Sequence, residues 1–146
     1  MDLPNKLVAI LNKDLPTGVV LNALAHAAVG LGAYLGKAQL ELDDYVDKNG
    51  NVYPNISKMP FIILRAKSGE IRKAVNAVKE AQLTHGIFVN TMTSGTYKEQ
   101  LANTAQTLEE QLIYYGCVLF GPVEVVNGIT KKFSLWRDAV ATPVSE

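Results

Sequence analysis

The 146-residue sequence has little of the residue types that mark several common functions: one cysteine, two histidines and one tryptophan, with 14 basic residues balanced by 14 acidic ones. The lone Cys117 excludes an intramolecular disulfide and is typical of a reducing compartment, so we expect a cytoplasmic protein. So few cysteines and histidines also argue against a zinc site, and we predict neither a metal nor a cofactor. The zero net charge disfavours a protein that follows a nucleic-acid backbone, so we expect no nucleic-acid partner.

Two further absences concern membranes. The N-terminus, MDLPNK, lacks the basic and apolar regions of a signal peptide. Leu15–Gly36 has no Asp, Glu, Lys or Arg, and its 22 positions are long enough to cross a bilayer. However, this segment contains Pro16, Asn22, His26 and four glycines, and it follows directly on a strand-like run. We therefore interpret it as a helix inside a sheet protein or at a subunit interface, and we expect no membrane association.

Short apolar runs alternate with helical patterns along the chain. Four runs have the length and composition of buried strands: Leu7–Leu11, Pro60–Leu64, Ile87–Val89 and Cys117–Phe120. Three segments between them have the spacing of helices: Thr17 to a point between Gly32 and Lys37, Gly69–Leu83, and Glu99–Tyr115. We expect Thr17 and Ser68 to cap the first two helices, and His85-Gly86 to end the second.

The same order of elements predicts the fold. An Asn49-Gly50 pair indicates a hairpin turn or a surface loop, and the segment KKFSLWR near the C-terminus alternates as an edge strand would. Strands that alternate with helices are joined by right-handed crossovers, which place helices on both faces of the sheet. We therefore predict a single α/β domain over residues 1–146. It is a three-layer α/β/α sandwich with a mixed, mostly parallel sheet of four to five strands.

Polar turns follow the first and third predicted strands. The turn Asn12–Gly18 leads into a helix N-terminus, and the loop Asn90–Thr96 is rich in hydroxyl groups. Because the carboxyl ends of parallel strands meet at one edge of a sheet, we expect the two segments to share a cleft. There Asp14 would orient a donor group, and the amides of Gly18 and Val19 would face an anion or a carbonyl. Nine residues are candidate ligand-binding residues: Asn12, Asp14, Thr17, Gly18, Val19, Asn90, Thr91, Thr93 and Thr96.

His26 allows two interpretations. A lone histidine on an apolar helix is usually a core residue that is hydrogen-bonded to a backbone carbonyl, but it can also belong to a site. No carboxylate lies one helical turn away to orient the ring, which weakens a general-base role. The sequence therefore identifies no catalytic residue.

The segment Asp14–Gly18, DLPTG, is followed eight residues after its glycine by His26-Ala27-Ala28, and the runs PFIILRA, HGIFVNT and VLFGP come later in that order. In these features most of the chain resembles the type 2 peptidyl-tRNA hydrolases, and the resemblance implies their fold. Those hydrolases have a lysine where this chain has Val19, a glutamine where it has Ala23, and an aspartate where it has Thr91. The missing lysine removes a phosphate contact, so the chain resembles a divergent branch that does not hydrolyse peptidyl-tRNA.

These observations favour a protein that binds a small polar ligand or a peptide end between the 12–18 turn and the 90–96 loop. Two alternatives stay open. The first is a divergent ester or amide hydrolase that uses Asp14 and either Thr91 or Thr96 around a bound water. The second is a homo-oligomeric interaction protein without catalysis, a homodimer formed through the apolar first helix and the FSLWR segment, with Trp136 and Arg137 as anchors.

Overall fold

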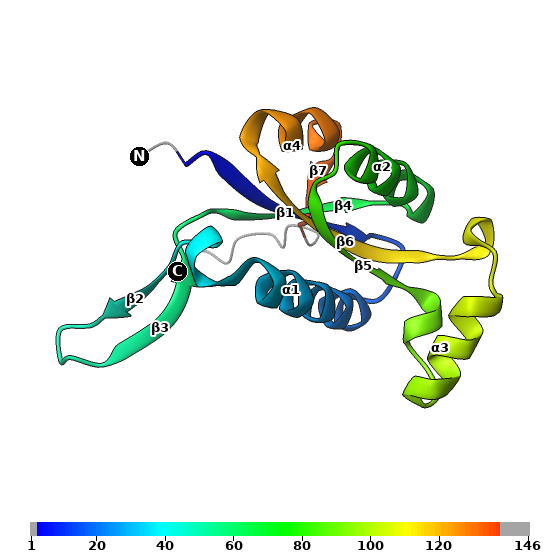
Figure 1. Cartoon of the computed structure of the whole chain (residues 1–146), viewed down its shortest axis with the longest axis horizontal. Coiled ribbons are helices and arrows are strands. Elements are labelled where there is room, and N and C mark those ends of the chain that lie inside the picture. Colours follow the sequence, from blue (N-terminus) through cyan, green and yellow to red (C-terminus); the bar gives the residue numbers. More distant parts are fainter. Residues whose placement is uncertain (1–2, 138–146) are drawn as a thin grey trace, which may run out of the picture.

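A computed structural model describes residues 3–137 of the chain. Seven strands and four α-helices lie in this range, with two short 3-10 helices (Figure 1). The strands are β1 (Asn5–Asn12), β2 (Leu42–Val46), β3 (Val52–Ser57), β4 (Phe61–Ala66), β5 (Thr84–Val89), β6 (Tyr114–Pro122) and β7 (Ser134–Leu135). The helices are α1 (Thr17–Gln39), α2 (Ser68–Glu80), α3 (Tyr97–Gln106) and α4 (Val123–Thr130), and the 3-10 helices are η1 (Asn90–Met92) and η2 (Glu109–Gln111).

Five strands form a mixed sheet in the order β5-β6-β1-β4-β7, and β2 pairs with β3 in a separate hairpin. Only the β1–β4 pair is parallel, while β1–β6, β5–β6 and β4–β7 are antiparallel. The prediction of a mostly parallel sheet is therefore wrong. Its error lies in the segment after β5, where α3 does not cross over the sheet and the chain returns antiparallel to β5 as β6.

Helices cover both faces of this sheet, as the sequence predicts. Strand β1 is buried on both sides: Val8 and Ile10 pack toward α2 and α4, while Leu7, Ala9 and Leu11 pack toward α1. The buried residues of α1 recur every three or four positions, as expected for a helix that lies along a sheet: Val20, Ala23, Ala27, Leu31 and Leu35. The core is thus divided into two apolar layers, one on each side of the central strands.

Helix α1 leaves much of its surface open. Its N-cap is Pro16, so Thr17 is the first helical residue and not the predicted cap. Gly36 interrupts the helix with a φ of 76° and a ψ of 176°, inside the range where the sequence predicts its end. Within the described residues α1 is the one helix long and apolar enough to cross a membrane, and 28% of its most apolar window is buried. One face of α1 packs on the sheet, and much of the rest is left exposed by the described residues 3–137.

Several local predictions are confirmed and others are wrong. The Asn49-Gly50 turn does connect a hairpin, β2–β3, and β7 pairs with the edge of β4 as the KKFSLWR pattern predicts. Helix α2 ends at Glu80, because Gln82 adopts a positive φ of 57°, and His85-Gly86 lies inside β5. The predicted helix Glu99–Tyr115 ends at Gln106, and the sequence did not predict α4.

Two further residues make contacts that the sequence does not predict. The Ser68 hydroxyl does not cap α2 but accepts a hydrogen bond from the Tyr114 N–H at 2.9 Å. Trp136 is partly buried against the α1 side of the core, and its backbone N–H donates to the Ile63 carbonyl at 2.9 Å. Trp136 therefore contributes to the core of its own chain, and its role as an interface anchor stays a prediction.

Candidate functional site

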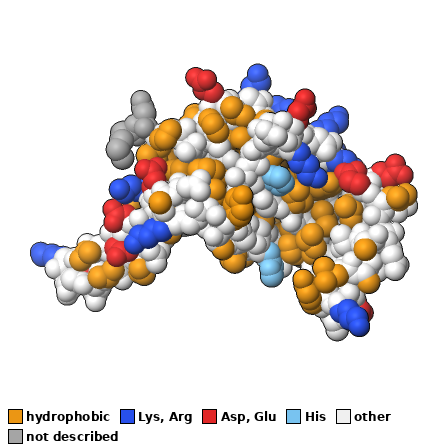
Figure 2. All heavy atoms as spheres, in the orientation of Figure 1, with side chains coloured by type: hydrophobic (Ala, Val, Ile, Leu, Met, Phe, Trp, Pro, Cys, Tyr) orange, Lys and Arg blue, Asp and Glu red, His pale blue; other side chains and the backbone are white. Residues whose placement is uncertain are grey.

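A groove runs along the side of α1 that faces β5 and α3. Its main part has a volume of about 890 Å³, and a second hollow of about 480 Å³ continues it toward the N-terminus of α1. The two parts share four lining residues: His26, Phe88, Met92 and Gln100. Figure 2 shows both histidines of the chain on this hollowed side of the molecule. The groove is thus formed by a helix face, the edge strand β5 and the segment that follows it.

His26 lies where the two parts of the groove meet. Its side chain is exposed, and its ring stacks on Phe88 with centroids 5.5 Å apart and an interplanar angle of 25°. Phe88 is itself only 6% exposed and packs against Tyr115 at 6.1 Å between centroids. The interpretation of His26 as a core residue is therefore wrong, because its ring lies on the surface of the groove and stacks on Phe88.

The close approach of α1 to β5 depends on Gly86. A Cβ atom at this position would lie 2.7 Å from the carbonyl oxygen of Ala27 and 3.3 Å from its carbonyl carbon. Any larger residue would therefore push against the backbone of α1. Gly86 sets the distance between the helix and the strand that form the two long walls of the groove.

Strands β1 and β5 end at the same edge of the sheet, as the sequence reasoning requires. Both are antiparallel to β6, which lies between them, so they point in the same direction. The start of β6 fills the space between their ends. Asn12, 3% exposed, donates from its side-chain amide to the Tyr114 carbonyl at 2.9 Å, and the Asn90 side-chain oxygen accepts from the Ile113 N–H at 2.9 Å. These two asparagines therefore hold β6 in place and do not line the groove.

Of the nine candidate residues, three line the groove: Gly18, Val19 and Thr93. The Val19 N–H already donates to the Pro16 carbonyl at 3.0 Å, so it does not face a ligand as predicted. The Thr93 hydroxyl donates to the Asn90 carbonyl at 2.7 Å. Asp14 and Thr17 are exposed and lie outside the residues that line the groove.

The two remaining candidates, Thr91 and Thr96, hold α3 against the end of β5. The hydroxyl groups of Thr91 and Thr104 are 2.7 Å apart, which ties η1 to the helix. The Thr96 hydroxyl accepts from the Glu99 N–H at 3.2 Å and caps the helix N-terminus. Both hydroxyls are therefore engaged in positioning α3, which forms the outer wall of the groove.

Comparisons with known proteins agree with this fold. The family model described as "Protein of unknown function (DUF2000)" matches residues 5–137. The chain belongs to the DUF2000 family. It is also similar to the solved structure of the protein of unknown function Atu0240 from Agrobacterium tumefaciens strain C58, with 24% identity and a TM-score of 0.79 over 93% of this chain and 100% of the other. The search of curated proteins gives no match. At this identity the likeness shows the fold alone, and the resemblance to type 2 peptidyl-tRNA hydrolases stays a prediction.

The sequence reasoning missed most of the groove of this DUF2000 protein. On α1 the groove side carries Asn22, His26, Gly30 and Tyr34, which are spaced four residues apart. This spacing is visible in the sequence as a stripe beside the buried one, so the helical period could have identified it. Tyr97 and Gln100 come from α3, and no local pattern indicates that this helix faces α1.

The residues lining the groove include no carboxylate, and the described range 3–137 has no group of three or more His, Cys, Asp or Glu arranged to hold a metal. The only cysteine of this DUF2000 protein is 2% exposed on the opposite side of the sheet, and burial raises the pKa of its thiol to about 12. Cys117 is therefore a protonated core residue and not a nucleophile. What the groove offers is aromatic surface, the imidazoles of His26 and His85, side-chain amides and several hydroxyl groups.

Proposed function

We propose that this DUF2000 protein binds a small polar ligand or the end of a peptide in the groove between α1, β5 and α3. The observation that carries the proposal is the exposed His26 ring, which is stacked on Phe88 at the junction of the two hollows. A groove of about 890 Å³ has the size of known ligand sites, which combine apolar walls with a few polar groups. Asn22, Thr93 and Gln100 supply such groups around the imidazole.

The position of β5 favours a peptide. This strand is the last in the sheet among the described residues, with β6 on one side only. The backbone N–H and C=O groups of an edge strand can pair with an extended peptide, which then lies parallel to the groove. The first turn of α1 follows at the narrow end, where the helix dipole favours a negative group such as a terminal carboxylate.

The departures from the peptidyl-tRNA hydrolases support binding without hydrolysis. Val19 stands in place of their lysine, and Ala23, in place of their glutamine, is 1% exposed and packs into the core. Neither residue supplies a charge or a polar group to a phosphate. The alternative ester or amide hydrolase has little support, because Asp14 does not line the groove and the hydroxyls of Thr91 and Thr96 are both engaged.

The test is a titration followed by NMR, with resonances of the His26 ring and the β5 amides as probes. Short peptides with a free C-terminal carboxylate are compared with the same peptides as C-terminal amides. We expect shifts at His26 and along β5 at about millimolar concentration or below, with weaker binding by the amides. His26→Ala should weaken binding about tenfold or more, while Lys132→Ala, on the far side of the sheet, should leave it unchanged. Peptides and small polar fragments that shift neither probe would overturn the proposal.

A further inference from the structure

The hairpin β2–β3 projects from the body of the protein, and no other strand of the described residues pairs with it (Figure 1). Five of its large apolar side chains are 49–64% exposed: Tyr45, Val46, Val52, Tyr53 and Ile56. Two-stranded hairpins are at best marginally stable in water, so one that exposes this much apolar surface needs a covering partner. The hairpin tip is held together by hydrogen bonds, because the Asp47 carboxylate accepts them from the backbone of Asn49 and Asn51 and from the Tyr53 hydroxyl.

Helix α3 lacks a partner in the same way. None of its ten residues is buried, and Tyr97 and Leu101 are 75% and 54% exposed. The helix is held at its start by the Thr96–Glu99 capping box and by the hydroxyl contact between Thr91 and Thr104. Because an isolated helix of this length is marginal in water, α3 also presents a surface that a second element would stabilise.

The third uncovered surface is the face of α1 that points away from the sheet. Ala25, Val29 and Ala33 follow one another at four-residue spacing on this face, and all three are exposed. Small residues at this spacing let a second helix approach closely. The segment Leu15–Gly36 contains no Asp, Glu, Lys or Arg, and the depletion of charge is typical of the core of a protein interface.

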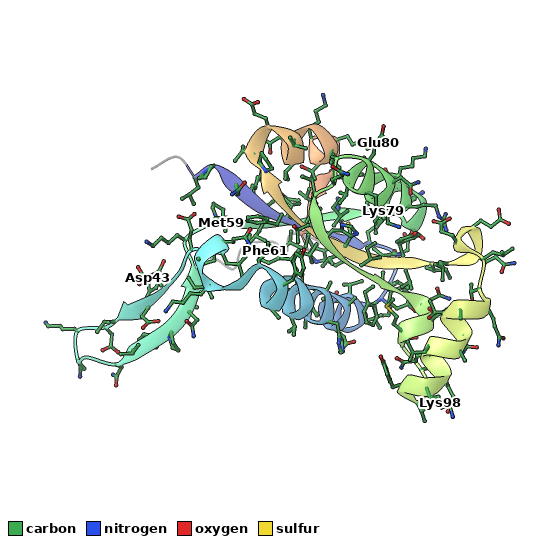
Figure 3. All side chains as sticks on the ribbon, in the orientation of Figure 1. Asp43, Met59, Phe61, Lys79, Glu80 and Lys98 are labelled. Carbon is green, nitrogen blue, oxygen red and sulfur yellow. The ribbon has the colours of Figure 1, made fainter. Side chains whose placement is uncertain are left out.

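We propose that two copies of this chain form a two-fold symmetric dimer. The α1 helices pack antiparallel through Ala25, Val29 and Ala33, and the β2–β3 hairpin of each copy lies against α3 of the other. The hairpin and α3 lie at opposite ends of α1, as Asp43 and Lys98 show (Figure 3). A two-fold rotation exchanges the two ends, so it places each hairpin on the partner's α3 and covers all three open surfaces at once.

The exposed apolar area favours a second copy as the occupant. Apart from the side chains that line the groove, eight large apolar side chains on the hairpin, α1 and α3 are at least 49% exposed. At on the order of 100 Å² each they offer about 800 Å² per copy, which is what a standard interface buries per partner. In this dimer the partner's hairpin also lies beside the open side of the groove.

Light scattering after size-exclusion chromatography tests the proposal on the full chain. We expect twice the chain mass of 15.9 kDa at micromolar concentration. Val29→Asp should give a monomer with an unchanged circular dichroism spectrum, because Val29 is 72% exposed and makes no core contact. Val125→Asp is the matched control: this residue is 40% exposed on α4, on the other side of the sheet, so the variant should stay dimeric. A monomer for the unmodified chain, including one that binds lipid vesicles through α1, would overturn the proposal.

The contact between hairpin and α3 has a separate test. Tyr45→Ser on the hairpin and Leu101→Ser on α3 should each raise the dimer dissociation constant about tenfold or more. In a mixture of Val46→Cys and Leu101→Cys copies, a flexible bismaleimide should join one copy to the other, whereas Val125→Cys with Leu101→Cys should give no such product. The buried Cys117 thiol adds no background. A dimer that persists in Val29→Asp, or that neither serine variant weakens, would exclude this arrangement. Because these readouts involve no ligand, they stand apart from the test of the binding groove.

Discussion

The substitution Gly86→Ala tests whether the groove depends on the close packing of α1 against β5. The added methyl group would lie 2.7 Å from the Ala27 carbonyl oxygen, 3.3 Å from its carbonyl carbon and 3.4 Å from its Cα. All three atoms belong to the helix backbone, so no side chain can rotate to make room. The helix must therefore shift away from the strand, and the residues it buries must shift with it.

The expected cost follows from two opposing effects. Overpacking in a well-packed core costs about 1–3 kcal/mol. Replacing glycine by alanine also restricts the unfolded chain, which offsets the cost by about 0.4–1 kcal/mol. We therefore expect Gly86→Ala to lower the free energy of unfolding by about 1–2 kcal/mol. For a domain of this size, that corresponds to a fall in Tm of roughly 2–8 °C.

Urea unfolding followed by circular dichroism measures this loss, with Gly128→Ala as the matched control. Gly128 lies in α4 and a Cβ there would meet no atom within 4 Å, so the same chemical change should raise stability by up to about 1 kcal/mol. The chemical shifts of the His26 ring should also move in Gly86→Ala, since its stacking on Phe88 depends on the same spacing. If Gly86→Ala were as stable as the control, or left the His26 resonances in place, the groove would not depend on this contact.

Three further outcomes are expected. Asn12→Ala should lower the free energy of unfolding by about 1–3 kcal/mol, because it leaves the Tyr114 carbonyl without the side-chain amide that donates to it. Urea unfolding measures this loss, and an unchanged midpoint would contradict the structural role of Asn12. The pKa of Asp47 lies at about 2, below the ordinary 3.8, because the side chains of Asn51 and Tyr53 donate hydrogen bonds to its carboxylate. The ionised carboxylate therefore stabilises the fold above pH 3.8, and this contribution is lost as the pH falls through 2. The protection of the hairpin-tip amides from exchange, relative to the unfolded chain at the same pH, should therefore fall in that window, and this fall should be absent in Asp47→Asn. Iodoacetamide at pH 8 should leave Cys117 unmodified in the folded protein and modify it in urea; equal rates in both would refute its burial.

The elements in the first half of the chain follow from local sequence patterns, because the apolar positions in those patterns are the positions that the fold buries. In β1 a continuous apolar run corresponds to a strand covered on both faces. In α2 the stripe of Ile71, Ala74, Val75 and Val78 is the buried face. At the hairpin, Gly50 has a φ of 86°, a value that glycine adopts without strain, and the Asn49-Gly50 pair indicates the turn correctly.

The second half departs from its patterns where tertiary contacts decide. Leu108, Leu112 and Tyr115 continue the helical spacing of α3, yet Thr107 is extended with φ −100° and ψ 128°, and Tyr114 and Tyr115 enter β6. The segment VEVVNGIT is rich in β-branched residues and still forms α4, because Val126 is fully buried against α2 and the sheet. Strand direction is not encoded locally at all, since a central strand that is apolar on both faces has the same pattern in either orientation.

The sequence places the candidate site at the edge of the sheet where β1 and β5 end, and the groove of the structure reaches this edge, but most of the predicted residues do not line it. Polar residues at the ends of buried strands, such as Asn12 and Asn90, lie where backbone groups of β6 need partners, and they satisfy those groups first. The groove is instead built from the side of α1 that adjoins its buried stripe, where the side chains of Asn22 and His26 make no hydrogen bond within the described residues and His26 only stacks on Phe88. A polar residue that interrupts an otherwise apolar helix is therefore the stronger sign of a binding surface here, because nothing in the fold requires it.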